Sequence, residues 1–440
     1  MKKLFLRTLL PVVAAWVLAS TSQTVLGQSV SFTTNSYYVT LPWIQTTTAN
    51  AIAADVFGTG RPAIISYLTV MINFGNGTFA TNAFYSAGGI IGSVVAADVN
   101  MDGKLDLIAV GSDKCTVLTN FNFGSFGSNA TINAGGNCAV TSDLNNDGKP
   151  DLLIGGNTNV FIFTNNGSGR FGSNATLNVL GPVFAMAVAD VNSDGSVDLI
   201  IANKNNASLT VFTNNGGGVL VSNATWAAGG GKSFAAADVN GDGLVDLITP
   251  YNLGTPGLRV LTNNGSGTFG SNATLRIPAG NGVFVISEVV AADLNGDGWV
   301  DLVGRDGTQS TDIIAVWTNS AYGFAYDGKI SAGAGSSDML LSMSVADLNG
   351  DNKPDLVLGN NANFVTVLLN TTLFASPPLN IFSAGNQSVL YWNGPAPDSV
   401  LQVTTNLNNP NWITVTNGKP ITGVMLPQTS PNQFYRLISQ

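Results

Sequence analysis

Short apolar runs separated by turn residues fill most of the chain, and none shows the 3.6-residue spacing of an amphipathic helix. A run of small or β-branched residues, such as SVVAA (93–97), precedes an Asp-rich loop. An apolar run such as DLIAV (106–110) comes next, and then a third such as NVFIFTN (159–165). After an Asn-Asn-Gly turn a fourth run follows, such as FGSNATL (171–177). Runs of this length, divided by Gly and Asn, predict units of four β-strands.

The loop between the first two runs carries a repeated pattern of acidic and amide residues. The frame is D-x-N-x-D-G-x-x-D, with one departure, Asn352, at the glycine position. Its six copies begin at Asp98, Asp143, Asp190, Asp238, Asp293 and Asp347. A seventh copy, from Asp55 to Ala63, keeps only the first Asp and the glycine, and successive copies start 43 to 55 residues apart. Four strands per repeat of this length predict an all-β, seven-bladed β-propeller, with a stacked solenoid as the alternative.

The two ends of the repeat region predict how the ring closes. The last unit stops after its third run, near Thr371, and has no FGSNAT-like fourth strand. The segment 32–42 resembles that missing strand, so we expect it to pair into the last blade. Closure of this kind removes exposed sheet edges.

Both flanks of the repeats differ from them in composition. At the N-terminus Lys2, Lys3 and Arg7 precede an apolar run too short to span a bilayer. A site for cleavage near Gly27 follows, which predicts a signal peptide over 1–27, export of the chain, and no membrane span in the mature protein. We place the propeller at 28–373 and a proline-containing linker at 374–380. Alternating runs over 381–440 predict a small antiparallel β module.

Composition excludes several classes of function. The chain has 440 residues, 45% hydrophobic and 10% charged, with 51 glycines and no histidine. The composition therefore excludes disorder as the main state of the chain, a Ser-His-Asp triad and His-ligated zinc. A net charge of −9 disfavours a nucleic-acid partner. The two cysteines, Cys115 and Cys138, we interpret as small buried side chains, although export would permit a disulfide.

These loops, each followed by an apolar strand and a G-x-G-x-F turn, resemble FG-GAP/VCBS repeats, the repeats of integrin-α-like seven-bladed propellers. The resemblance covers about residues 29 to 373. It implies calcium on the face of the Asp loops and partner docking on the opposite face. The tail more weakly resembles C-terminal β modules of secreted bacterial proteins.

The residues themselves also indicate calcium. Oxygen ligands at positions 1, 3 and 5, glycine at 6, a carbonyl at 7 and Asp at 9 suit a hard cation. An EF-hand is excluded because position 12 is never Glu. The loops hold 18 of the 26 acidic residues, and three carboxylates so close together would repel one another without a cation. Loss of Lys2, Lys3 and Arg7 with the signal peptide takes the net charge from −9 to −12, which six Ca²⁺ ions would balance.

We therefore predict about six calcium ions and none in the first copy, where Phe57, Thr59 and Ala63 replace ligands. Asn352 tolerates the left-handed backbone, so its loop is expected to bind. The predicted ligands are Asp98, Asn100, Asp102, Asp106, Asp143, Asn145, Asp147, Asp151, Asp190, Asn192, Asp194, Asp198, Asp238, Asn240, Asp242, Asp246, Asp293, Asn295, Asp297, Asp301, Asp347, Asn349, Asp351 and Asp355.

No catalytic constellation stands out, so the favoured function is a secreted binding or adhesion module with an extracellular protein or polysaccharide partner. An extracellular hydrolase or lyase acting on carbohydrate is the alternative, and a passive surface scaffold is a third. The longest repeats add loop length on the face away from the Asp loops. We therefore place a candidate ligand face at Tyr251, Arg305 and Asp306.

Overall fold

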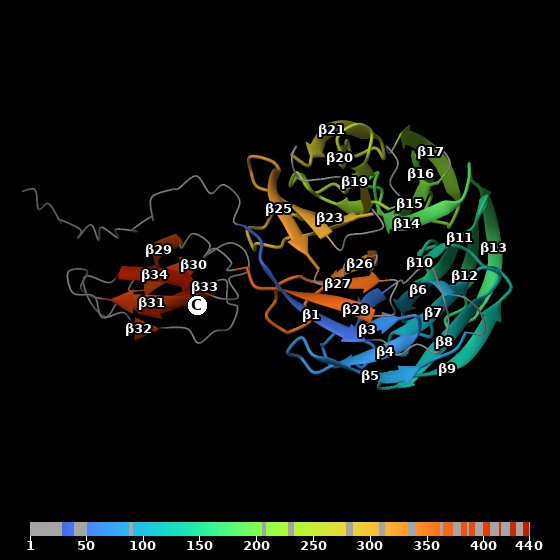
Figure 1. The fold of residues 1–440 in the computed structure, drawn as a ribbon, viewed down its shortest axis with the longest axis horizontal. Coiled ribbons are helices and arrows are strands. Elements are labelled where there is room, and N and C mark those ends of the chain that lie inside the picture. The colour runs from blue at the N-terminus through green and yellow to red at the C-terminus, as the bar shows by residue number, and fades with distance from the viewer. Residues whose placement is uncertain are drawn as a thin grey trace, which may run out of the picture. The chain divides into compact units, whose positions relative to one another are not determined.

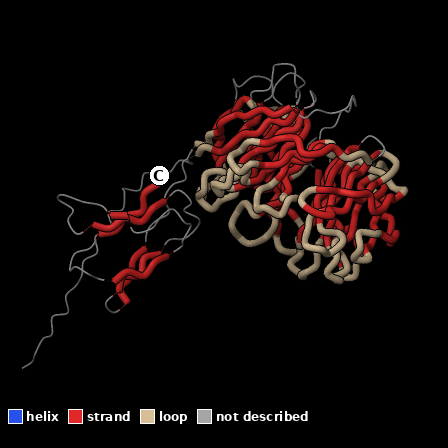
Figure 2. The backbone as a smooth tube through the Cα atoms, turned by 90° about the horizontal axis from the view of Figure 1, so that it is seen from below, coloured by secondary structure: helices blue, strands red, loops and turns tan. Residues whose placement is uncertain are grey.

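The structure is a computed structural model. It describes residues 29–38, 51–87, 91–204, 208–227, 233–278, 285–307, 313–332, 340–360, 364–372, 380–384, 387–391, 399–404, 413–414, 423–427 and 434–439. All regular elements in these ranges are β-strands (Figure 2). No helix among the described residues is long and apolar enough to cross a membrane. The predicted signal peptide, 1–27, lies outside the described residues.

Seven four-stranded antiparallel sheets form the blades of a propeller, as the repeat predicted (Figure 1). Blades 1 to 4 comprise β2 (Ala51–Ala54), β3 (Ala63–Ser66), β4 (Thr69–Asn73) and β5 (Phe79–Phe84); β6 (Ile91–Ala97), β7 (Asp106–Gly111), β8 (Cys115–Asn122) and β9 (Ser125–Ile132); β10 (Cys138–Ser142), β11 (Asp151–Gly155), β12 (Asn159–Asn165) and β13 (Phe171–Asn178); and β14 (Val183–Ala189), β15 (Asp198–Asn203), β16 (Ser208–Asn214) and β17 (Leu220–Ala227).

Blades 5 to 7 comprise β18 (Ala235–Ala237), β19 (Asp246–Tyr251), β20 (Gly257–Asn263) and β21 (Phe269–Arg276); β22 (Ile286–Ala292), β23 (Asp301–Asp306), β24 (Ile313–Thr318) and β25 (Ala325–Ser331); and β26 (Leu340–Ala346), β27 (Asp355–Asn360), β28 (Phe364–Asn370) and β1 (Phe32–Tyr38). First strands of most neighbouring blades contact one another, which places them nearest the axis. Their small side chains, such as those of Ala235–Ala237, suit this crowded position.

The ring closes as the sequence predicted. Strand β1 pairs antiparallel with β28, from Phe32 opposite Asn370 to Tyr38 opposite Phe364. The chain thus completes the last blade with a strand that precedes the first blade, and the two blades share a cluster of buried side chains. Residues 39–42 of the predicted closing segment lie outside the described residues.

The hydrophobic core is divided among the blade interfaces. Seven clusters of buried side chains each join two neighbouring blades. Ile64 and Val357, for example, belong to the cluster that joins blades 1 and 7. Full burial of a side chain of this size contributes about 1.5–3 kcal/mol. Each interface therefore has its own hydrophobic core. These cores hold in place the strand ends that carry the loops.

The chain separates into two compact units, of which one contains the propeller strands and the other contains β29 onward. In the second unit β29 (Asn380–Ala384), β30 (Gln387–Tyr391) and β33 (Gly423–Pro427) form one three-stranded sheet. Strands β32 (Ile413–Thr414), β31 (Ser399–Thr404) and β34 (Phe434–Ser439) form another. All pairings are antiparallel. The expected domain boundaries and the linker at 374–380 remain predictions, because residues 373–379 lie outside the described part of the chain.

Candidate metal centres

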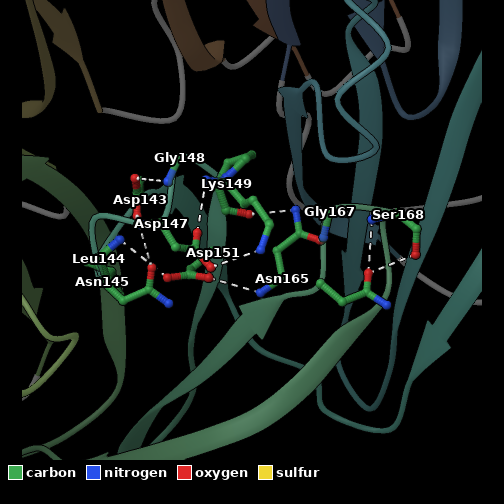
Figure 3. A network of polar contacts seen from close by, with 12 residues as sticks. Asp143, Leu144, Asn145, Asp147, Gly148, Lys149, Asp151, Asn165, Gly167 and Ser168 are labelled. Atoms are coloured by element: carbon green, nitrogen blue, oxygen red, sulfur yellow. Dashed lines mark hydrogen bonds and ion pairs between the residues drawn. The ribbon is translucent and has the colours of Figure 1, made fainter.

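Each Asp-rich loop joins the first strand of a blade to its second strand, so the loops lie at one end of every blade. Figure 3 shows the loop of blade 3, which begins at Asp143 after β10 and ends at Asp151, the first residue of β11. The second strand starts with the ninth-position residue in all seven copies. The repeat therefore fixes where every candidate ligand stands relative to the sheet.

The first-position Asp closes the loop on itself. In blade 3 the backbone N–H groups of Asp147 and Gly148 donate to Oδ1 and Oδ2 of Asp143, at 3.1 and 2.7 Å. Gly148 has φ of +83°, a conformation that glycine adopts without strain. At this position in blade 7, Asn352 has φ of +62° and donates its N–H to Asp347. Asparagine therefore takes the left-handed conformation, as expected.

The side chains of the first and third positions both accept a hydrogen bond from the backbone N–H of the fifth position. The N–H of Asp147 also donates to Oδ1 of Asn145, at 3.0 Å, so oxygens of Asp143 and Asn145 lie within 3.1 Å of one atom. Asp147 itself accepts from the backbone and from Nζ of Lys149, and the side-chain bond is the main cause that lowers the pKa of Asp147. Three oxygen-bearing side chains thus surround one turn on the surface of the blade.

The ninth-position Asp is buried and accepts hydrogen bonds from backbone N–H groups. Asp151 has no exposed surface and accepts N–H groups from Leu144 (3.3 Å) and Asn165 (2.9 Å). Burial raises its pKa, and at the equivalent Asp355 burial raises the pKa to about 7. The same pair of bonds recurs at Asp106, Asp198, Asp246, Asp301 and Asp355. This carboxylate therefore ties the loop to the third strand of its own blade.

An asparagine at or near the end of the third strand bonds to the preceding blade. In blade 3, Nδ2 of Asn165 donates to the carbonyl of Val99 in the loop of blade 2, at 2.9 Å. The equivalent bond joins every pair of neighbouring blades: Asn73 to Leu348, Asn120 to Val56, Asn165 to Val99, Asn214 to Leu144, Asn263 to Val191, Asn319 to Val239 and Asn370 to Leu294. Sequence reasoning missed this role by assigning the Asn-Asn-Gly segment to a turn. The signal was an asparagine at one position of all seven units.

The first copy keeps the loop closed without the other acidic residues. Thr59 and Gly60 donate their N–H groups to Asp55 at 3.0 and 2.6 Å, the same pattern as in blade 3. Ala63 stands where the buried Asp would be, and it is completely buried. Phe57, at the third position, packs on Gly124 of blade 2. The hydrogen bonds that the first Asp accepts are thus sufficient to close the loop, and the additional oxygens of the six other loops are not needed for it.

The donor set of the six loops fits a hard cation. All candidate side-chain ligands are carboxylate or amide oxygens, which Ca²⁺ prefers. Among the described residues, no three Asp, Glu or Cys side chains converge closely enough to hold a metal ion in the conformation that the structure shows. The carboxylates of the first, fifth and ninth positions instead accept backbone N–H groups. Calcium remains a prediction that rests on the chemistry of the donors.

The candidate ligand residues lie at the ends of β19 and β23, opposite the Asp loops, but they differ in burial. Arg305 is 8% exposed and Asp306 is 1% exposed. Nε of Arg305 pairs with Glu288 at 3.0 Å, and Asp306 accepts the N–H of Val285. Burial raises the pKa of Glu288. Neither Arg305 nor Asp306 is a surface side chain, whereas Tyr251 is half-buried.

The two cysteines are free thiols in the structure. Cys115 is buried at the start of β8 in blade 2, and Cys138 begins β10 in blade 3. Burial raises the pKa of both thiols to about 12. Cys115 is buried, as we interpreted it from the sequence, whereas Cys138 is partly buried against the core between blades 3 and 4.

Comparison with known proteins agrees with this architecture. The FG-GAP-like repeat profile matches residues 143–201, 190–249, 252–304 and 293–358. A structure of an Agrocybe aegerita lectin, described as specifically recognising non-reducing terminal N-acetylglucosamine, aligns with a TM-score of 0.51. Its identity is 24%, over 72% of this chain and 86% of the lectin chain. BBS1N in complex with ARL6DN aligns with a TM-score of 0.53 at 10% identity, over 78% and 98% of the two chains. At these identities the two structures show the fold alone. No curated protein matches the sequence.

Proposed function

Because the chain is a seven-bladed β-propeller of FG-GAP repeats, we propose that it is an exported, calcium-stabilised module that binds an extracellular glycan. The observation that carries the proposal is the sixfold recurrence of one oxygen-only donor set on a single end of the blades. Six loops with three carboxylates each far exceed what loop closure requires, because the first copy closes with one. The excess charge is what a bound cation would neutralise.

Calcium would stabilise the fold of the propeller and would not take part in a reaction. Positions 1, 3, 5 and 9 of each of the six loops would hold the ion, which would supply positive charge to a loop that carries three carboxylates. A ligand that binds only the folded chain stabilises it by mass action. The loops also carry the carbonyl groups that accept the interblade asparagine bonds. Calcium bound there would stiffen the contacts between blades as well as within them.

A glycan is the ligand class that we favour. The supporting observations are the layout of residues 1–27, which is that of a signal peptide, and the likeness in fold to a glycan-binding lectin. A rigid ring that presents loops on its second face is a common arrangement for binding. Two of the described carboxylates outside the loops are poorly placed for a hydrolase, because Glu288 is paired with Arg305 and Asp306 is buried.

The test combines metal analysis with glycan binding. Protein purified in calcium and freed of unbound ions should carry six Ca²⁺ ions per chain. Its melting temperature should fall in EDTA and be restored by Ca²⁺ but poorly by Mg²⁺. A glycan array with and without chelator should show calcium-dependent binding. An ion-free protein with the same melting temperature would refute the calcium proposal, and an array without binding would refute the glycan proposal.

A further inference from the structure

One aromatic ring in blade 5 is contacted by two arginines. The guanidinium carbon of Arg259 lies 4.0 Å from the centroid of the Tyr251 ring, and that of Arg276 lies 4.7 Å from it. Cation–π contacts of this kind stabilise a guanidinium against a ring face. Two like charges on one ring also repel each other, so the arrangement favours the arrival of a negative group.

Strand register explains why these three side chains meet. Tyr251 of β19 lies opposite Gly257 of β20, and Gly257 lies opposite Arg276 of β21. Opposite residues share a face of the sheet, and Arg259 shares it because it is two residues from Gly257. Gly257 has no side chain to separate Tyr251 from Arg276, and a Cβ there would lie 1.9 Å from the carbonyl oxygen of Leu275. Tyr251 ends β19, Arg259 lies near the start of β20 and Arg276 ends β21, so all three residues lie toward the end of blade 5 away from its Asp loop.

The positive charges of Arg259 and Arg276 do not recur at the equivalent positions of the other blades. Positions equivalent to Arg259, paired with the fourth residue of the second strand, are Thr69, Thr116, Phe161, Thr210, Ala315 and Thr366. Positions equivalent to Arg276 are Asn178, Ala227 and Ser331. A second strand that ends in tyrosine also occurs only in blade 5 among the described blades. The cluster is therefore an addition to a scaffold that folds without it.

Much of the hydrogen-bonding capacity of both guanidinium groups is unused. Nη1 of Arg259 donates to the carbonyl of Ala227 at 3.1 Å, and Nη1 of Arg276 donates to the carbonyls of Leu253 (3.2 Å) and Thr255. Nε of Arg259 is buried and has no hydrogen-bond partner in the described part of the chain. Neither arginine forms an ion pair with a described carboxylate. Each guanidinium has five N–H donors, and those left over suit the oxygens of a carboxylate or sulfate.

We propose that Tyr251, Arg259 and Arg276 form a subsite for an anionic polysaccharide, which binds through the carboxylate or sulfate of one sugar. The inference rests on the proposed glycan-binding function and names the class of glycan. The two guanidinium groups, oriented by the ring and by their backbone carbonyl partners, donate to the anionic oxygens in charge-assisted hydrogen bonds. Because the whole chain is acidic, with a net charge of −9, a polyanion binds only where positive charge is concentrated.

The test measures binding of the full chain to three polymers in calcium: polygalacturonate, dextran sulfate and unmodified dextran. We expect binding to at least one anionic polymer, none to dextran, and weakening at higher salt. Preference between polygalacturonate and dextran sulfate distinguishes carboxylate from sulfate. Arg259→Gln and Arg276→Gln should each weaken binding at least tenfold. Arg170→Gln is the matched control, since Arg170 is an exposed arginine at the Asp-loop end of blade 3, and its affinity should not change.

The outcomes separate this inference from the general function. Undiminished binding in both variants, or equal binding of dextran, would overturn the subsite. Arg276→Gln keeps the test valid if Arg259→Gln unfolds, because the described acceptors of Arg276 are carbonyls of its own blade, whereas Arg259 donates to a carbonyl of blade 4. Binding of neutral glycans on an array, without any binding of the two polyanions, would leave the proposed function intact and refute the subsite. Absence of all glycan binding would refute both.

Discussion

Asn73 in the first blade donates its Nδ2 group to the backbone carbonyl of Leu348 in the last blade, at 2.9 Å and across 275 positions of sequence. The same asparagine also donates to Pro62 in its own blade. Its side chain therefore joins the loop of one blade to the loop of its neighbour at the point where the ring closes. Six further asparagines make the equivalent contact at the other interfaces.

Asn73→Ala should destabilise the propeller by about 1–3 kcal/mol, because it leaves the buried carbonyl of Leu348 without that donor. Denaturant unfolding in calcium measures the effect. Asn76→Ala is the control: Asn76 is exposed and bonds only to Thr78 within its turn, so its loss should cost less. Equal losses in the free energy of unfolding would show that the bond from Asn73 to Leu348 stabilises the propeller no more than an exposed turn bond does.

Loss of one loop ligand should remove one ion. Asp351→Ala takes away the fifth-position carboxylate of the last loop, and metal analysis should then count five Ca²⁺ ions per chain. Thr59→Ala changes the fifth position of the first loop, which lacks the other ligands, and should leave six. A count that falls in both variants, or in neither, would contradict the assignment of ions to loops.

Acid should weaken calcium binding. Burial raises the pKa of Asp355 to about 7, above the value of about 3.9 for an unfolded Asp, so the folded metal-free chain holds this proton more tightly. The stability of the metal-free chain therefore falls as pH rises from about 4 to about 7. Between these limits protons compete with Ca²⁺, and calorimetry should give a weaker calcium affinity at pH 5.5 than at pH 7.5. Equal affinities at the two pH values would exclude a role for the ninth-position carboxylates in binding.

Gly124→Ala should destabilise the contact between blades 1 and 2. Gly124 has φ of +71°, and a Cβ there would lie 2.5 Å from Cε1 of Phe57. Strain of the left-handed conformation costs about 1–2 kcal/mol, and overpacking against the ring adds about 1–3 kcal/mol. Gly323→Ala isolates the strain, because Gly323 has φ of +94° and no atom within 4 Å of the added Cβ. Thermal unfolding of both variants should show the larger loss at Gly124, and equal losses would mean that the ring moves aside freely.

Glu288→Ala should destabilise the fold by about 3–5 kcal/mol, because it leaves the buried guanidinium of Arg305 without its carboxylate at 3.0 Å. The double substitution Glu288→Met with Arg305→Met removes both charges and should lose less than the sum of the single changes. Unfolding curves of the three variants measure the coupling. Additive losses would show that the pair contributes nothing as a pair.

Sequence alone determined the blades, the closure of the ring and the positions of the loops. Strand runs, Gly-Asn turns and the Asp frame recur at one spacing, and each is a local feature whose chemistry can be recognised without its neighbours. The missing fourth strand after Thr371 was filled by Phe32–Tyr38 because an unpaired sheet edge needs a partner. Asn352 at the glycine position was explained in the same local way.

Only the tertiary structure decided what those residues contact across blades. The bond from Asn73 to Leu348 depends on a ring that brings residues 275 positions apart together. The burial of Arg305 and Asp306, which we had placed on a ligand face, depends on Glu288 and Val285 of the adjacent strand and its loop. The two arginines on Tyr251 meet only through strand register and the missing side chain of Gly257. Local pattern fixes the strands and turns, whereas burial and charge pairing are properties of surfaces that exist only after the blades have packed.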